Sequence, residues 1–247
     1  MSTRRSWWTH LGVGAATALC AVAPALGQGA TVRGAGYFAG GVLRLDVDDL
    51  NAAVRAAVPG APAVDGTAVG FGGGGYSVRG PWILGGEGFG TAVPTRRSAT
   101  HEARLRAGYG VFRVGYNLLP PASTLLYPSV GIGGGALALT LTRRGAQTFG
   151  DALANPRVSQ LERGMAVLDV GLALETVTGR RATRGRHAQG WGGWVLGLRA
   201  GYLVPFARGD WRQQGEGLAG GPGTELRGPY VRLVVGAGGL GWRRHRW

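Results

Sequence analysis

The chain has a single cysteine and no lysine. Its one cysteine, Cys20, lies in an apolar N-terminal segment, so the rest of the chain has no disulfide, thiolate zinc site or cysteine nucleophile. All 27 basic residues are arginine, and they outnumber the 13 acidic residues to give a formal net charge of +14. A balance this basic favours an anionic partner, which would be nucleic acid in a cytosolic protein and lipid phosphate in an exported one.

Long apolar runs are also lacking, except at the N-terminus. Two arginines precede an apolar stretch over 11–26, and Ala25-Leu26-Gly27 supplies the small residues that a signal peptidase requires. A membrane anchor is the alternative, but about 16 residues are short for a span of ~20. We predict a cleaved signal peptide over 1–27 and a single mature domain over 28–247. Export then favours outer-membrane lipid or lipopolysaccharide as the anionic partner, and we expect no nucleic-acid partner.

Glycine is abundant, at 49 of 247 residues. The sequence has no G-X-Y period, which excludes collagen, and 45% of it is hydrophobic, which favours an ordered chain over a disordered one. The glycines therefore belong to folded structure.

Alternation of apolar residues with polar or small ones is the recurring pattern. It places side chains on opposite faces of a strand, most clearly over 165–176, where Leu168 and Leu172 alternate with Asp169 and Glu175. Eight segments of this kind predict eight strands, at 37–46, 67–78, 82–91, 100–116, 125–142, 165–176, 191–204 and 229–242.

Two of these segments need interpretation. Over 100–116, Leu105 and its apolar neighbours share one face and Arg104 and Arg106 the other. Over 125–142, the apolar positions change parity, so we predict a bulge at Gly133–Gly135 that resets the phase.

The connections indicate how the strands are joined. The long connections, near 47–66, 143–162 and 205–228, broadly alternate with short ones, as in outer-membrane barrels with short periplasmic turns and long outer loops. We therefore predict an all-β fold, an eight-stranded antiparallel up-and-down β-barrel with its core at about 36–242. The first outer loop is predicted to hold a short helix over 49–58, capped by Asp48.

The eight segments, the leader and a strand close to the C-terminus resemble the small bacterial outer-membrane β-barrels, the class of outer membrane proteins A and X. The segments Asp46–Asn51 and Gly228–Leu233, with the glycine-aromatic strands, also resemble glycine-rich bacterial proteins of this kind. The resemblance implies an outer-membrane location in a Gram-negative-type envelope and contact with the barrel-assembly machinery during biogenesis. A shared fold supplies no specific activity.

Aromatic and basic residues gather near the predicted strand ends. The basic segment 180–187 falls in the sixth connection and is predicted as a periplasmic turn. The aromatic residues are expected in girdles at the two membrane interfaces: Trp82, Tyr109, Tyr116, Tyr127, Trp191, Trp194, Tyr202, Tyr230 and Trp242.

Charges of inward parity are the candidate site. In a narrow eight-stranded lumen they must pair or meet water, and glycines at 72–75 and 133–135 would make room for them. Such a network either plugs the barrel or lines a narrow polar path. The predicted lumenal charges are Arg44, Glu87, Arg104, Arg106, Asp169, Glu175, Arg199 and Arg232.

Signals for catalysis are weak. Ser98, His101 and Glu102 lie close in sequence but lack a recognisable motif, and the glycine-rich segment 131–136 is followed by a strand pattern rather than the helix of a dinucleotide site. The aspartates at 46–49 lack the glutamate of an EF-hand. We therefore expect no enzyme activity, catalytic residue, cofactor or metal. We expect instead a monomeric protein of structural or surface-interaction type. A narrow outer-membrane channel and a secreted soluble barrel that binds an apolar ligand are the alternatives.

Overall fold

The computed structural model describes residues 34–120, 123–145, 148–154, 157–183 and 188–243. The chain divides into two compact units, 1–30 and 31–247, and every described residue belongs to the second. The predicted signal peptide, 1–27, lies outside the described residues.

Eight long strands form the wall of this unit: β1 (Gly34–Arg44), β2 (Thr67–Arg79), β3 (Trp82–Ala92), β5 (His101–Tyr116), β6 (Thr124–Arg143), β7 (Val158–Thr183), β8 (Ala188–Arg208) and β11 (Gly228–Arg243). Three short strands lie in the connections: β4 (Arg96–Arg97), β9 (Trp211–Gln213) and β10 (Glu216–Leu218). The helices are α1 (Asp48–Ala57) and α2 (Phe149–Ala154).

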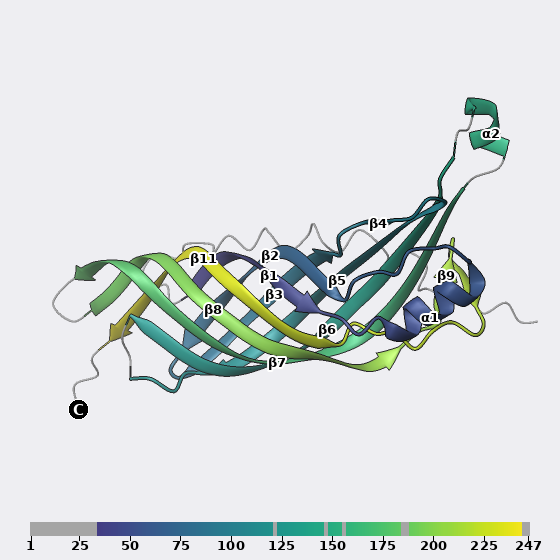
Figure 1. Cartoon of the computed structure of the whole chain (residues 1–247). Coiled ribbons are helices and arrows are strands. Elements are labelled where there is room, and N and C mark those ends of the chain that lie inside the picture. The colour runs from purple at the N-terminus through teal and green to yellow at the C-terminus, as the bar shows by residue number, and fades with distance from the viewer. Residues whose placement is uncertain (1–33, 121–122, 146–147, 155–156, 184–187, 244–247) are drawn as a thin grey trace, which may run out of the picture. The chain divides into compact units, whose positions relative to one another are not determined.

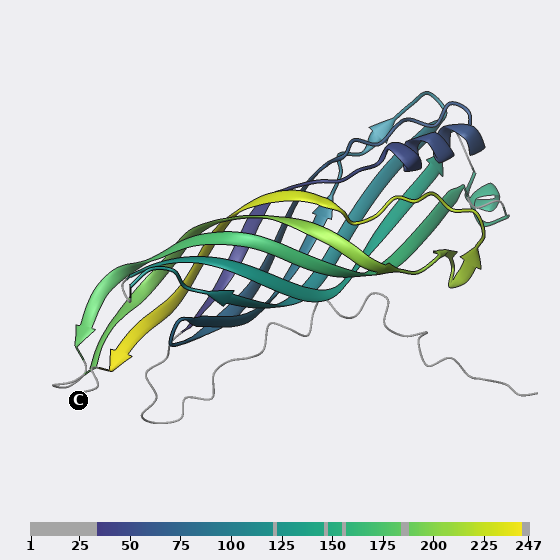
Figure 2. The ribbon, with the colours of Figure 1, turned by 90° about the horizontal axis from the view of Figure 1, so that it is seen from below.

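The wall closes on itself. Each long strand pairs antiparallel with the next along the chain, and β1 pairs with β11 (Figures 1 and 2). Following the paired residues around the wall from Gly34 leads to Pro229 of β11, which precedes Tyr230, the partner of Leu43 on β1. Extending this register by one residue returns the path to β1 at Arg44, ten residues beyond Gly34 (44 − 34). This stagger is the shear that tilts the strands of a closed barrel. The predicted eight-stranded antiparallel barrel is confirmed.

The connections fall into two groups. One end of the wall carries the connections that follow β1, β3, β6 and β8, and the other carries 80–81 and the described residues 117–120 and 123. In the two-residue turn between β2 and β3, Gly80 has a φ of +60°, which suits glycine. The long and short connections are therefore segregated by end more completely than the sequence predicted.

As predicted, a short helix lies in the first connection. Leu50 lies on the apolar side of this helix and is buried. Asp48 and Asp49 occupy its first turn, where their negative charge interacts favourably with the helix dipole. The predicted cap is wrong, because Val47 is the N-cap and no side chain caps the helix. In the described part of the chain, no helix is both long and apolar enough to cross a membrane.

Two details of the strands differ from the prediction. Residues 180–183 continue β7 instead of forming a turn, because the β7–β8 ladder runs to Thr183, and 184–187 lie outside the described residues. No register shift occurs at Gly133–Gly135, so the predicted bulge is wrong. A register shift occurs instead between Ala166 and Val167, where β7 pairs with β8.

Candidate functional site

Charged side chains from five wall strands meet inside the barrel. Each of the six is at most 7% exposed, although arginine and glutamate are rarely buried without partners. Tyrosines from three further positions join them. We call this set the lumenal network: Glu87, Arg113, Asp169, Glu175, Arg199 and Arg232, with Tyr37, Tyr127 and Tyr230.

Glu87 on β3 is the centre of the lumenal network. Its Oε2 accepts hydrogen bonds from the Tyr37 hydroxyl at 2.8 Å and from Arg199 Nη1 at 2.6 Å. Arg113 Nη1 also donates to Oε2, at 3.2 Å, and Arg232 Nη1 donates to Oε1. One carboxylate therefore links β3 to β1, β5, β8 and β11 across the lumen.

Arg199 joins Glu87 to a second carboxylate. Its Nε donates to Glu175 Oε1 at 2.7 Å, and the same oxygen accepts from the Tyr127 hydroxyl at 2.7 Å. The guanidinium also lies over the Tyr37 ring, 4.1 Å from its centroid. Ionised hydrogen bonds and a cation–π contact together offset the removal of this charge from water.

Arg113 joins Glu87 to the third carboxylate. Its Nη2 donates to Asp169 Oδ2, and Asp169 Oδ1 accepts from the Tyr230 hydroxyl at 2.6 Å. Because Arg113 reaches both acids, the three carboxylates belong to one connected network.

Arg232 is held mainly by aromatic rings. Its guanidinium carbon lies 3.8 Å from the ring centroid of Tyr230, 4.2 Å from that of Phe89 and 5.2 Å from that of Tyr109. Its Nε and Nη2 have no hydrogen-bond partner among the described residues. The rings around it take the place of part of the lost hydration.

The charges of the lumenal network balance, with three carboxylates facing three guanidinium groups. Burying such groups is unfavourable unless each is paired, and removing one partner leaves another charge buried alone. The arrangement therefore links seven of the eight wall strands, and removal of a single charged member is expected to lower stability.

The structure places five of the eight predicted lumenal charges in this network: Glu87, Asp169, Glu175, Arg199 and Arg232. The other three are corrections, because Arg44, Arg104 and Arg106 point outward. They lie at the end of the wall, where the inside is filled by leucine and the outward side leaves a charge exposed. Arg113 was missed because its parity is that of Tyr109 and Val111, which the sequence suggested to be an outward face.

Two sections of the wall differ in which face is polar. We call the first the belt section, where every charged residue of the described wall points inward. It comprises 36–42, 69–77, 82–92, 108–116, 124–138, 164–178, 192–206 and 229–239.

We call the second the outer section, made of 101–106 of β5, 139–143 of β6 and 158–163 of β7. Its inward face carries Leu105 and Leu139, which are buried, and its outward face carries Arg106 and Gln160, which are exposed. The alternation continues unbroken from one section to the other, but the apolar face changes sides. The change of parity that the sequence attributed to a bulge is this exchange.

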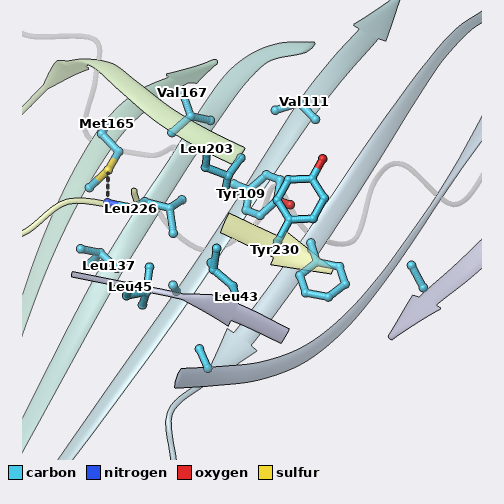
Figure 3. Close-up of a cluster of buried hydrophobic side chains, with 14 of the residues drawn as sticks. Leu43, Leu45, Tyr109, Val111, Leu137, Met165, Val167, Leu203, Leu226 and Tyr230 are labelled. Carbon is cyan, nitrogen blue, oxygen red and sulfur yellow. Dashed lines mark hydrogen bonds between the residues drawn. The ribbon is translucent and has the colours of Figure 1, made fainter. Parts of the chain in front are cut away.

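A cluster of buried apolar side chains, which we call the leucine layer, lies inside the barrel near the long connections (Figure 3). Leu43, Leu137 and Leu203 enter it from the wall, and Leu226 enters it from the connection before β11; all four are fully buried. The Leu226 N–H donates to Met165 Sδ at 3.1 Å, drawn as a dashed line in Figure 3. The last connection thus inserts a side chain into the barrel mouth.

Arg163 holds this connection in place. It is 8% exposed, and its Nη1 donates to the carbonyls of Pro222, at 2.9 Å, and Thr224, at 3.0 Å. Its Nε donates to the Gly209 carbonyl at 3.0 Å. Three backbone carbonyls on one guanidinium fix the segment that carries Leu226.

Inward glycines make room for the lumenal network, as the sequence suggested. A Cβ on Gly74 would lie 2.7 Å from the Tyr37 hydroxyl, and one on Gly201 would lie 2.5 Å from the Tyr230 hydroxyl. Gly133 and Gly135 also face inward, whereas the alternate glycines of the same runs face outward.

Little space remains beside the network. A cavity of about 10 Å³ lies between Tyr37, Tyr76, Glu87 and Tyr127, which is at the lower limit for one water molecule. The Tyr76 hydroxyl has no partner among the described residues and lines this cavity.

The outward face of the belt section is apolar on every strand. The exposed fractions of its side chains reach 79% for Phe38, 81% for Phe71 and 67% for Leu233. Leu172 and Leu198 are about half exposed, so the leucine rows point out of the barrel. A water-soluble monomer rarely exposes so continuous an apolar surface.

Some of the expected aromatic girdle faces outward and some does not. Trp82 and Tyr116 are exposed and pack edge to face, with ring centroids 5.3 Å apart, and Trp194 and Tyr202 are exposed as well. For Tyr109, Tyr127 and Tyr230 the prediction is wrong, because they point into the lumen, where their hydroxyl groups or rings meet the charges. The side chains of Trp191 and Trp242 lie outside the description.

The weaker motifs do not assemble into sites. The Ser98 hydroxyl donates to the Gly60 carbonyl at 2.7 Å and accepts from the His101 backbone N–H at 3.0 Å, so it does not meet the imidazole. The segment 131–136 continues within β6. Among the described residues, no three histidine, cysteine, aspartate or glutamate side chains are grouped to hold a metal ion.

Comparison with known proteins adds one likeness of fold. No protein-family model matches the chain, and no curated protein matches it. The chain is similar to the crystal structure of Ail, the attachment invasion locus protein of Yersinia pestis, with 11% identity and a TM-score of 0.44 over 85% of this chain and 99% of that one. No inference about activity follows from a likeness of this extent.

Proposed function

We propose that this protein is a noncatalytic outer-membrane β-barrel with a sealed lumen, which acts as a structural or surface-interaction component. The observation that carries the proposal is the belt section, where large apolar side chains face outward on all eight wall strands and the charges face inward. This is the polarity of a barrel in lipid and the reverse of a soluble one. Insertion into lipid would remove the apolar outward face of the belt section from water.

The connections support an orientation. In barrels of this class the long loops lie outside the cell and the short turns in the periplasm. The connections 45–66, 144–157 and 209–227 would then meet the surroundings, and the barrel-assembly machinery would insert the chain as a monomer. Contacts with other molecules are proposed for these loops.

The interior favours a plug over the two alternatives. The balanced lumenal network and the leucine layer above it fill the barrel, and eight-stranded barrels leave room for little more than side chains. A channel needs a continuous wet path, and a soluble ligand-binding barrel needs an apolar interior with free volume. The channel and the soluble ligand-binding barrel are therefore less consistent with the filled interior than a plug is.

Cell fractionation and gel mobility test the proposal. We expect the full chain, expressed in a Gram-negative host, to appear in the outer-membrane fraction and to migrate differently when it is heated before electrophoresis. Planar bilayers with the purified protein should show no single-channel steps. Recovery in the soluble periplasmic fraction would refute the membrane location, and regular conductance steps would refute the sealed lumen.

A further inference from the structure

Two outward arginines lie where the belt section gives way to the outer section. Arg104 and Arg106 follow each other on the outward face of β5, and Arg106 is flanked by Ala92 of β3 and Ala138 of β6. Among the described residues Arg106 has no hydrogen-bond or ion-pair partner. Arg104 Nε donates to Thr95 Oγ1 at 3.2 Å, and its Nη2 lies 3.6 Å from Glu102 Oε1.

On the belt side of Arg106, the outward positions of β5 and of the facing part of β3 are glycine, and Ala136 of β6 lies opposite Gly108. Gly108 and Gly110 follow on β5, opposite Gly90 and Gly88 of β3. A Cβ at any of these four positions would meet nothing closer than 3.7 Å, so the fold of the barrel itself does not require glycine there. We call these four residues, with Gly134 of β6 beside Gly110, the glycine strip.

Large apolar side chains border the glycine strip. Phe71 lies opposite Gly90, and Phe112 follows Gly110 on β5; the two are 81% and 56% exposed. The glycine strip therefore has no side chains between these large apolar neighbours, and it begins beside Arg106, which is exposed, and Arg104, which is partly exposed.

We propose that Arg104 and Arg106 bind the phosphate of an outer-leaflet lipid while an acyl chain of that lipid lies along the glycine strip. The inference rests on the proposed membrane location and adds a ligand class to it. Guanidinium groups bind phosphate through paired, charge-assisted hydrogen bonds. A flat wall without side chains lets a straight hydrocarbon chain approach the backbone closely, which increases dispersion contacts.

Nearby arginines provide a matched control. Arg96 forms an ion pair with Asp65 at 3.1 Å, and Arg97 forms one with Glu102 at 2.8 Å. Replacing both by glutamine removes the same charge as Arg104→Gln with Arg106→Gln. If the interaction is specific to the site, the two double variants will differ in lipid retention. A general effect of charge would lower retention equally in both.

Native mass spectrometry of the reconstituted protein tests the proposal. The full mature chain is placed in phosphatidylcholine nanodiscs that contain a trace of diphosphoryl lipid A, and the retained lipid is counted. Arg104→Gln with Arg106→Gln should lower retention about thirtyfold, and Arg106→Gln alone about fivefold, if each arginine contributes as usual at an anionic surface. Arg96→Gln with Arg97→Gln should retain lipid like the parent protein.

Two further arms separate the parts of the site. Gly108→Leu with Gly110→Leu fills the strip without a backbone clash and should also lower retention, and inorganic phosphate should not displace the lipid. Unchanged retention in the arginine variant, or equal loss in the control, would overturn the phosphate site. Unchanged retention in the glycine variant, or displacement by inorganic phosphate, would overturn the acyl part.

Failure of this inference is distinguishable from failure of the proposed function. Heat-dependent gel mobility and nanodisc insertion of each variant show whether the barrel forms and enters lipid. A parent protein that inserts but retains no lipid A overturns the site alone. A parent protein that does not insert overturns the proposed function.

Discussion

The belt section and the outer section use the same strands with opposite faces. On β5, Arg106 faces outward and Leu105 inward, whereas a few residues further along Phe112 faces outward and Arg113 inward. The alternation of side chains is a property of the strand, but the choice of the polar face depends on what lies outside the wall at that level. With the proposed membrane location, β5 and β6 therefore combine a water-facing and a lipid-facing arrangement with no register shift between these two strands.

The two interiors are stabilised differently. In the outer section the inward Leu105 and Leu139 are buried by the hydrophobic effect, as in a soluble protein. In the belt section the outward apolar side chains would gain nothing from burial against one another if they lie in lipid, as proposed. The inside of the belt section instead depends on a hydrogen-bonded, charge-balanced network. The lumenal network should therefore be more sensitive to a single substitution than the surface of either section.

The largest effect is expected at the centre of the lumenal network. Glu87→Gln leaves three arginines facing two carboxylates, so we expect the free energy of unfolding to fall by about 3–5 kcal/mol. Urea titration of the protein in vesicles, followed by tryptophan fluorescence, measures it. Adding Arg232→Met should recover part of the loss, and Asp65→Asn on an exposed connection should have little effect; equal losses for Glu87→Gln and Asp65→Asn would contradict a special role for the network.

A charge placed outside should distinguish the two sections. Leu172→Arg puts a guanidinium on the outward face of the belt section and should destabilise the inserted barrel by about 2–4 kcal/mol, since that face would lie in hydrocarbon. Gln160→Arg makes the same change on the outward face of the outer section and should be nearly neutral. If the two variants unfold at the same urea concentration, the proposed boundary between the sections is wrong.

Glycines on the two faces of the belt should respond differently to a methyl group. Gly201→Ala forces a Cβ to within 2.5 Å of the Tyr230 hydroxyl, and overpacking of this kind typically lowers stability by about 1–3 kcal/mol. A Cβ at Gly88 would lie 4.0 Å from its nearest neighbour, so Gly88→Ala should leave the unfolding curve unchanged. A loss of the same size at both sites would show that the strands need glycine for its backbone rather than for space.

The smallest effect concerns a water-facing connection. The backbone N–H of Thr67 donates to Asp65, and this bond, with help from Arg96, lowers the pKa of Asp65. A lowered pKa means that the contribution of Asp65 is present above its unfolded pKa and is lost as the pH falls through the folded one. Proteolysis of the connection 45–66 should therefore increase slightly on acidification in the parent protein, and Asp65→Asn should abolish that pH dependence while leaving the barrel resistant.

Much of the wall was predictable from residue type alone. Over 165–176 the outward leucines and the inward Asp169 and Glu175 lie as the sequence indicated, because this strand crosses the belt and carries only one polarity there. The predicted segments 100–116 and 125–142, on β5 and β6, pass from one section to the other, and for them no single assignment of the apolar face to the inside or the outside holds. Arg104, Arg106 and Arg113 are the same residue type in one alternating strand, and nothing in their immediate sequence indicates which side of the boundary each occupies.

The partners within the lumenal network were less predictable than its members. Glu87 meets Arg113, Arg199 and Arg232, which are 26, 112 and 145 residues away along the chain. Parity placed Glu87, Arg199 and Arg232 inside but not Arg113, and the shear of the closed wall decides which side chains share a level.

The sequence by itself determined the eight strands, their antiparallel order and the need for glycine in a narrow interior, because alternation, turn residues and side-chain volume are local properties. Only the tertiary structure decided which face of each strand is the inside at a given level, and which carboxylate meets which arginine. Those choices depend on closure and on the medium beyond the wall, and both act on all eight strands together.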